Sequence, residues 1–381
     1  MSPPKFLLRD LAFGSLAVVT LAGLFASGFF SPGRQPAAAQ ADSFAVNSGE
    51  TTSQAPPSSD RSVPDVAGFV AETSAPVSNP EKSSGGRGIQ LGIGGSLNGF
   101  RPFPEDNAWN RVITNAPVDP NSRTLIASIG LDKTLHPDFA AGMWDGSRIG
   151  IPYVVVGGDQ PMVPLEIVAY PGESDPGPYP IPANAPIEGE PNARGDRHVI
   201  VLDRDNLKLY ELFHSVRGFL GTAWQADSAA IFDLTEHPHR PDGWTSADAA
   251  GLPIFPGLVR YDEVVEQKEI RHALRFTVVR SRRAYTPPAT HCASRNDSPN
   301  LPPMGMRVRL KGTFDVDGYP PQARVILTAL KRYGMILADN GGDWFLSGAP
   351  DHRWDDEQLR TLKQIRGSDF EVIRMDEITV P

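Results

Sequence analysis

The sequence predicts a mainly β protein, sandwich or jelly-roll-like, with two helices near the C-terminus; an α+β fold is the alternative. Three observations predict it. The middle of the chain carries many short runs of β-branched and aromatic residues, which suit a pleated sheet. The 381 residues include 36 Gly and 37 Pro, whose backbone preferences favour turns over long helices. Helical spacing of apolar residues is clear in only two segments, both beyond residue 320.

The predicted strands begin with two pairs. Residues 151–156 and 163–170 are separated by a Gly-Gly-Asp-Gln turn. Residues 198–203 and 207–214 flank an Arg-Asp-Asn turn, which predicts a hairpin because Asp and Asn tolerate positive φ. Further strands are expected at residues 229–233, 258–261, 273–279 and 306–310.

The two predicted helices are residues 322–333 and 355–366. The first begins after two prolines, ends at Gly334 and places four large side chains on one face. The second begins among Asp residues, which cap backbone N–H groups, and ends at Gly367.

The first 41 residues have the features of a secretory signal peptide. Two basic residues precede an uncharged stretch, residues 11–30, and Ala39 and Ala41 match the small-residue cleavage pattern. The uncharged stretch is also long enough to cross a bilayer, so an uncleaved N-terminal anchor is the alternative. Either interpretation predicts that the rest of the chain lies in the cell envelope or the extracellular space.

Residues 42–88 predict a disordered tether, rich in Ser, Pro and Gly, with Phe44 and Phe69 as its only aromatic residues. All six Trp and all eight Tyr lie beyond residue 100. We therefore expect residues 89–381 to form a single globular, β-rich domain, which is long enough to bury most of its chain surface.

Composition excludes several classes of function. The chain has 45 acidic and 36 basic residues, a formal charge of −9, which argues against a nucleic-acid partner because phosphates require a basic surface. Its single cysteine, Cys292, excludes an intramolecular disulfide and a multi-cysteine zinc site. No metal site and no cofactor are predicted.

Glu211 is a charged residue in an otherwise apolar predicted strand. Alternation places it on one face with leucines and a phenylalanine, where a carboxylate costs free energy unless it has a partner or a function. With a four-residue loop, 203–206, His198 would lie opposite Glu211. The two residues are then a candidate catalytic carboxylate and a substrate-binding histidine; a structural ion pair is the alternative.

Asp248 is the only charged residue of the stretch 244–253. It either caps the backbone of a tight turn or lines a cleft as a catalytic carboxylate, with Trp244 as a platform for a sugar ring. In the turn at residues 338–344, Asp339 is the third candidate catalytic carboxylate and Trp344 a candidate substrate-binding aromatic, although turn chemistry alone also explains both.

Cationic groups gather on and after the predicted strand 273–279. Arg275 offers a bidentate fork for a uronate or another anion, and His291 would contribute to the same substrate-binding cluster. The alternative is that Arg275 pairs with a carboxylate on a neighbouring strand. His272 is a candidate catalytic base.

Seven segments beyond residue 190 resemble known sequences. They are GDRHV (195–199), KLYEL (208–212), GWTSADAAGLP (243–253), PGLVRYDE (256–263), HALRF (272–276), LPPMG (301–305) and YGMILADN (333–340). Together they resemble a family of uncharacterised secreted bacterial proteins, over about residues 100–375. The resemblance implies export and one compact domain, and it implies no activity.

We expect a secreted carbohydrate-active enzyme that acts on an extracellular or cell-wall polysaccharide, with a glycoside hydrolase favoured over a lyase. A hydrolase would draw two carboxylates from Glu211, Asp248 and Asp339. A lyase would neutralise a uronate with Arg275 and abstract a proton with His272 or a nearby Tyr. The alternative is a non-catalytic protein that binds glycan or builds the envelope, with membrane contact only through the N-terminal anchor.

Overall fold

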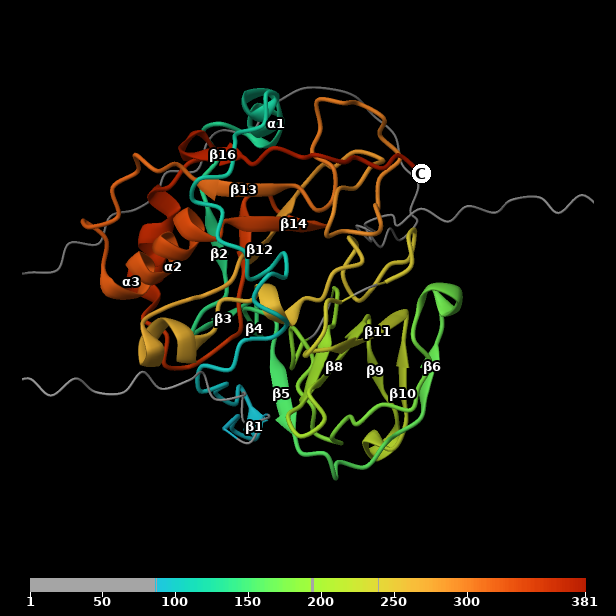
Figure 1. Cartoon of the computed structure of the whole chain (residues 1–381). Coiled ribbons are helices and arrows are strands. Elements are labelled where there is room, and N and C mark those ends of the chain that lie inside the picture. The colour runs from blue at the N-terminus through green and yellow to red at the C-terminus, as the bar shows by residue number, and fades with distance from the viewer. Residues whose placement is uncertain (1–85, 87, 193–194, 239) are drawn as a thin grey trace, which may run out of the picture. The chain divides into compact units, whose positions relative to one another are not determined.

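Two β-sheets, with a stretch of chain between them, form the centre of the fold (Figure 1). The computed structural model describes residues 86, 88–192, 195–238 and 240–381. The predicted signal peptide and nearly all of the predicted tether lie outside these ranges. The described residues belong to one compact unit, Pro76–Pro381. Across these ranges we find no helix with the length and hydropathy needed to cross a membrane.

The fold is mainly β, as the sequence predicts, with 24% of the described residues in strands and 16% in helices. The five-stranded sheet has the order β1 (Gly92–Ile93), β5 (Tyr153–Val156), β7 (Val199–Asp203), β8 (Lys208–Phe213), β11 (Ser228–Asp233). The six-stranded sheet has the order β16 (Phe370–Val372), β13 (Arg307–Leu310), β14 (Met335–Asn340), β12 (Leu274–Val278), β15 (Phe345–Ser347), β2 (His136–Asp138). The smaller sheets are β6 (Leu165–Ile167), β10 (Trp224–Ala226), β9 (Val216–Arg217), and β3 (Met143–Trp144) with β4 (Ser147–Arg148).

Both C-terminal helices are present. The first is α2 (Pro321–Arg332), whose hydrophobic side chains pack into the core. The second is divided into α3 (Asp356–Arg360), capped by the Asp355 side chain, and the 3₁₀ turn η5 (Thr361–Gln364). Figure 1 shows α2 and α3 side by side at one edge of the six-stranded sheet.

The structure also contains helices that the sequence pattern does not predict. These are α1 (Ser122–Ile129), the π-helical turn η4 (Asp262–Gln267) and the 3₁₀ turns η1 (Pro171–Glu173), η2 (Phe219–Gly221), η3 (Phe255–Gly257) and η6 (Gly367–Asp369). Most are a single turn, too short for a period of 3.6 residues to be visible. In α1, burial of Leu125, Ile126 and Ile129 stabilises a helix that has no side-chain N-cap.

The β7–β8 hairpin forms, but its register differs from the predicted one. Asp203 pairs with Lys208, so Ile200 lies opposite Glu211 and His198 does not. The Asp203 carboxylate accepts the N–H groups of the two turn residues Asp205 and Asn206 at 3.0 Å each, and the left-handed residue that closes the turn is Leu207, with φ +51°. Because Leu207 belongs to the turn rather than to the strand, the residue opposite Glu211 is Ile200 instead of His198, two positions along β7. A shift of two residues keeps every side chain on its predicted face of the sheet.

Strand β12 has the predicted alternation. Leu274, Phe276 and Val278 belong to the hydrophobic core, while Arg275 and Thr277 point to the opposite face. The predicted strand 258–261 is wrong: it makes one isolated bridge and leads into η4. Strands β14 and β15, on either side of β12, were not predicted.

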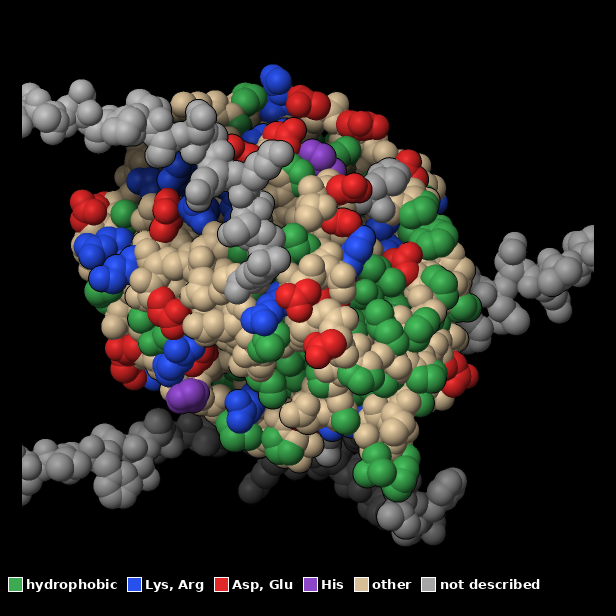
Figure 2. Space-filling model, turned by 60° about the horizontal axis from the view of Figure 1, so that its bottom comes forward, with side chains coloured by type: hydrophobic (Ala, Val, Ile, Leu, Met, Phe, Trp, Pro, Cys, Tyr) green, Lys and Arg blue, Asp and Glu red, His purple; other side chains and the backbone are tan. Residues whose placement is uncertain are grey.

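Part of the surface is apolar. Figure 2 shows hydrophobic side chains gathered on the right of one face, with few charged side chains among them. Among the exposed hydrophobic residues, Phe219 and Leu220 in η2 are 85% and 72% exposed.

Trp344 is a core residue. Its ring is fully buried and stacks between Phe276, at a centroid distance of 5.8 Å, and Phe370, at 5.2 Å. Its indole N–H donates to the Gly130 carbonyl at 3.1 Å, which satisfies the buried polar atom. The tryptophan therefore joins β12, β16 and the loop after α1.

We expect Trp344→Ala to lower the free energy of unfolding by about 3–5 kcal/mol, because it leaves a large cavity and removes two stacked contacts. The control is Trp144→Ala, since the Trp144 side chain is 78% exposed and its removal should change stability by about 0.5 kcal/mol or less. Urea unfolding followed by circular dichroism measures both. Equal losses in the two variants would contradict the role assigned to Trp344.

Candidate functional site

The chain between β11 and β12 passes between the two large sheets; residues 244–257 of it are termed the linking segment. On one side, the Ser228 hydroxyl and the His198 ring hydrogen-bond to its carbonyl oxygens, at 2.7 and 3.1 Å. On the other side, the Ala250 N–H donates to the carbonyl of Ala338 in β14 at 2.9 Å. The linking segment is thus hydrogen-bonded to both sheets.

Arg275 is the central charge of this region. Its Nε and Nη2 donate to the two carboxylate oxygens of Asp248 at 2.7 and 2.8 Å, and its Nη1 donates to Ser347 Oγ at 2.6 Å. Asp339, on the neighbouring strand β14, lies 3.5 Å from Nη2. The guanidinium is almost fully buried, and its pKa is raised because the Asp248 carboxylate outweighs the effect of burial. Arg275 is thus engaged by carboxylates, one of them on a neighbouring strand, as the alternative interpretation of the sequence expects.

Asp339 lies at the boundary of the buried region, with its side chain 18% exposed. Burial and the nearby Asp248 carboxylate raise its pKa to about 7, against the opposite influence of Arg275. The Asp196 carboxylate acts in the same direction. A protonated Asp339 is therefore populated near neutral pH, next to an Asp248 whose charge is matched by Arg275.

Glu211 is fully buried on β8. Its carboxylate accepts the backbone N–H groups of Ile254, at 2.8 Å, and Phe255, at 2.8 Å, where η3 begins. Burial raises the pKa of Glu211 to about 7 although both N–H groups favour the ionised form. In this position Glu211 holds the linking segment onto the five-stranded sheet and has no exposed atom to offer a substrate.

His198 is buried beside Glu211 and hydrogen-bonds on both ring nitrogens. Nδ1 lies 2.6 Å from Glu188 Oε2, and Nε2 lies 3.1 Å from the carbonyl of Ala247. Burial opposes the charged form, but the Glu188 carboxylate outweighs it and raises the pKa of His198 to about 9. The same contact holds the pKa of Glu188 below its usual value, despite the burial of that group.

The structure therefore brings together five of the nine candidate residues, namely His198, Glu211, Asp248, Arg275 and Asp339, as one buried charge network. The network includes both members of the predicted His198–Glu211 contact, although they are not directly opposite.

The other four candidates lie elsewhere. His272 is buried against the Glu263 carboxylate, at 3.0 Å, in a separate cluster with Arg260. Trp344 lies in the core, where it cannot present a face to a ligand.

Trp244 is the first residue of the linking segment and His291 contacts that segment, but neither belongs to the charge network. The guanidinium of Arg240 lies 5.6 Å from the half-buried Trp244 ring. The Nδ1 atom of the half-buried His291 lies 2.7 Å from the carbonyl of Ala249. Neither residue lines the hollow that opens next to the charge network.

A hollow of about 830 Å³ opens next to the charge network. Its lining includes the carboxylates of Asp138, Glu188 and Asp196, and the exposed Trp144 at one side. Two contacts join it to the network: Glu188 holds His198, and Asp138 lies opposite Ser347 in the β2–β15 pair. Through Glu188 and Asp138, this charged hollow brings solvent close to the network.

The pKa values of Asp138 and Glu188 are shifted in opposite directions. Asp138 is an exposed residue, yet desolvation by the protein around it and the Glu188 carboxylate raise its pKa. The His198 imidazolium lowers the pKa of Glu188. One carboxyl group is thus biased towards its neutral form and its neighbour towards its ionised form, which is the arrangement that acid–base catalysis needs.

Sequence reasoning missed both of these carboxylates. Asp138 stands in a short His-Pro-Asp segment and Glu188 in a Pro- and Gly-rich loop, so neither interrupts an apolar strand. The pairing of β2 with β15, more than 200 residues away in sequence, places Asp138 in the hollow. The sequence offers one weak signal for Glu188: it is an acidic loop residue that lies ten residues before His198.

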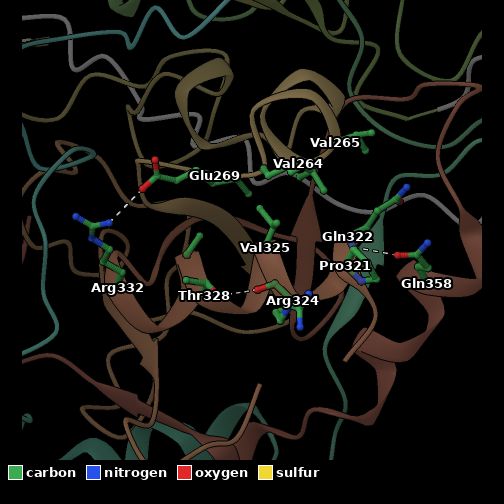
Figure 3. A pocket seen from close by; sticks show the side chains of 13 residues that line it. Val264, Val265, Glu269, Pro321, Gln322, Arg324, Val325, Thr328, Arg332 and Gln358 are labelled. Atoms are coloured by element: carbon green, nitrogen blue, oxygen red, sulfur yellow. Dashed lines mark hydrogen bonds and ion pairs between the residues drawn. The ribbon is translucent and has the colours of Figure 1, made fainter. Parts of the chain in front are cut away.

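A second hollow, of about 460 Å³, lies between η4 and α2 (Figure 3). Val264, Val265 and Val325 are part of its apolar lining, and Arg332 and Glu269 form an exposed ion pair at 3.2 Å across one end. No member of the buried charge network lines it. The charged hollow, which holds carboxyl groups with shifted pKa values, is therefore the candidate site.

Within the described ranges, no group of three or more His, Cys, Asp or Glu side chains is arranged to hold a metal ion. Comparison of the chain with protein-family models, curated proteins and solved structures finds no match. The assignment of a function therefore depends on the geometry and charge of the site.

We expect Arg275→Met to lower the free energy of unfolding by about 3–5 kcal/mol, because it leaves the Asp248 carboxylate buried without its counter-charge. Adding Asp248→Asn should recover part of that loss. Arg283→Met is the control, since its ion pair with Asp297 is exposed on both sides and worth about 0–1 kcal/mol. Urea unfolding measures all four proteins. A loss for Arg275→Met no larger than that for Arg283→Met would contradict the proposed importance of the buried pair.

We expect the stability of the protein to fall as the pH rises from 6.5 to 9. The folded pKa of His198, about 9, lies above the ordinary value of 6.5, so its stabilising charge is fully present below pH 6.5 and is lost as the pH rises through 9. The slope contributed by this group reaches at most about 1.4 kcal/mol per pH unit.

Unfolding by urea at a series of pH values tests this. His198→Gln should flatten the decline, and His352→Gln, a change at a histidine whose side chain is 86% exposed, should leave it unchanged. If His198→Gln and the wild type decline equally, His198 is not the group responsible.

Proposed function

We propose that the protein binds a carbohydrate chain in the charged hollow and hydrolyses a glycosidic bond there. The observation that carries the proposal is the pair of neighbouring carboxyl groups, Asp138 and Glu188, with pKa values shifted in opposite directions in one solvent-accessible hollow. Most glycoside hydrolases use one carboxylic acid to protonate the leaving oxygen and one carboxylate as base or nucleophile.

In this proposal Asp138 is the general acid. Its raised pKa favours the protonated form that can donate to the glycosidic oxygen. The pKa of Asp339 is also raised, but Asp339 does not line the hollow and is therefore not assigned as the acid.

Glu188 is the base or nucleophile. It is held ionised by His198, and its side chain is 25% exposed towards the hollow. His198 does not touch the substrate and serves as a positioning residue: it fixes the Glu188 carboxylate and supplies the counter-charge.

Trp144 gives the hollow a carbohydrate-binding surface. The side chain is 78% exposed at the hollow, which leaves the ring face free to pack on the apolar face of a pyranose. An extracellular or cell-envelope substrate agrees with the predicted secretory leader, so we propose that the protein acts outside the cytoplasm.

The second candidate function is glycan binding without catalysis. It is favoured by the burial of Glu211 and Asp248, since these carboxylates, which the sequence puts forward as catalytic, hold structural partners instead. A binding protein would retain the Trp144 surface and need no proton transfer.

We expect Glu188→Gln and Asp138→Asn each to lower the rate of oligosaccharide release at least ~100-fold, because general acid–base groups contribute about 10²–10⁴ to the rate. The full-length protein is incubated with a panel of bacterial and plant polysaccharides, and products are identified by mass spectrometry. Glu190→Gln is the matched control, since Glu190 pairs with Arg217 and does not line the hollow.

Full activity in both variants would show that the hydrolase assignment of this site is wrong. Products with unsaturated ends would show that the bond is cleaved by elimination and not by hydrolysis. Retardation in polysaccharide gels without any product would favour the binding protein.

A further inference from the structure

The charged hollow is lined by side chains of both signs. Its acidic lining residues are Asp138, Glu188, Asp196 and Asp356, and its basic lining residues are Arg148, Arg197, Arg360 and Lys363. Arg360, at the end of α3, and Lys363, in η5, are both exposed. A neutral glycan needs no cation, so exposed basic side chains in the hollow require their own explanation.

The same hollow contains an aromatic surface. His136 of β2 and Phe345 of β15 are directly opposite in the sheet, and their rings stack at a centroid distance of 4.1 Å and an interplanar angle of 13°. Both residues line the hollow and are half-buried. A flat, partly exposed pair of rings is a surface on which a sugar ring can pack.

The aromatic surface and Asp138 are linked by the period of the strand. His136 and Asp138 are two residues apart in β2, so they lie on the same face, roughly 6.6 Å apart along the strand. A sugar ring on the His136–Phe345 stack therefore has Asp138 near one of its ends.

The charge of Lys363 reaches the His136–Phe345 stack. Burial and the Lys363 ammonium together lower the pKa of His136, so the charge of Lys363 is felt at the aromatic surface. Arg360 has one ion pair, with Glu357 at 3.1 Å, in which both side chains are more than two-thirds exposed. Such a pair is weak, so the guanidinium can turn to a ligand at little cost.

We propose that the hollow takes an acidic polysaccharide, with one sugar ring on the His136–Phe345 stack and its anionic substituent, a carboxylate or a sulfate, bound by Arg360 and Lys363. The inference rests on the proposed function, because Asp138 and Glu188 then stand beside the bond next to the bound ring. The net charge of −9 repels polyanions at long range, so affinity must come from these local cations.

Affinity electrophoresis of the full-length protein tests the inference. The gels contain polygalacturonate or alginate for carboxylates and dextran sulfate for sulfates, each beside its uncharged counterpart: methyl-esterified polygalacturonate, propylene-glycol-esterified alginate and dextran. At least one acidic polymer should retard the wild type at least tenfold more strongly than its counterpart does, and raised salt should weaken that retardation. The polymer that retards identifies the anionic group.

The variant Arg360→Gln/Lys363→Gln should lose at least tenfold in affinity for that polymer. Arg374→Gln/Lys311→Gln removes two exposed positive charges from residues outside the hollow and should bind like the wild type. An unchanged thermal midpoint in both variants confirms that they fold. Glu188→Gln should still be retarded, because Glu188 has no contact with the anionic substituent.

Equal retardation by the acidic and uncharged forms of every pair, or wild-type affinity in Arg360→Gln/Lys363→Gln, would overturn the inference. The proposed hydrolysis fails separately: an acidic polymer bound through Arg360 and Lys363 but never cleaved would support this inference and refute that function. Cleavage of an uncharged glycan alone would support the proposed hydrolysis and refute the preference for an acidic polysaccharide.

Discussion

Arg275 imposes the strongest constraint on this fold, because a guanidinium keeps its charge at every accessible pH and here has almost no contact with water. A buried charge of this kind needs a carboxylate inside the protein. Asp248 supplies it bidentately, which fixes the middle of the linking segment against β12. Once that segment is fixed, its backbone meets Glu211 and His198 on the five-stranded sheet. One ion pair therefore determines how the two sheets are joined.

The same constraint divides the carboxylates into two groups. Glu211 and Asp248 are fully buried and hold backbone N–H groups or Arg275, so their oxygens are committed to the fold. Asp138 and Glu188 have oxygens that face the hollow, and the network sets their protonation from behind. The residues that hold the sheets together thus also tune the residues that meet solvent.

Sequence pattern finds the first group more easily than the second. A charged residue in an apolar strand is conspicuous, which is why Glu211 and Arg275 could be selected and their faces predicted. Glu188 has no such background in its loop, and Asp138 reaches the hollow only through a parallel pairing with β15 that no local pattern encodes. The hairpin register failed for a local reason, because a leucine at positive φ is not expected from its residue type.

Glu188 and His198 stabilise each other's charge, and this has a consequence for the hollow. Glu188 is ionised above its lowered pKa, and the His198 charge that keeps it so persists up to about pH 9. The ionised carboxylate is therefore constant across the neutral range. Desolvation raises the pKa of Asp138, and the constant negative charge of Glu188 raises it further for as long as the pair is intact. The difference between the pKa values of Asp138 and Glu188 thus depends in part on His198, which is buried behind the hollow.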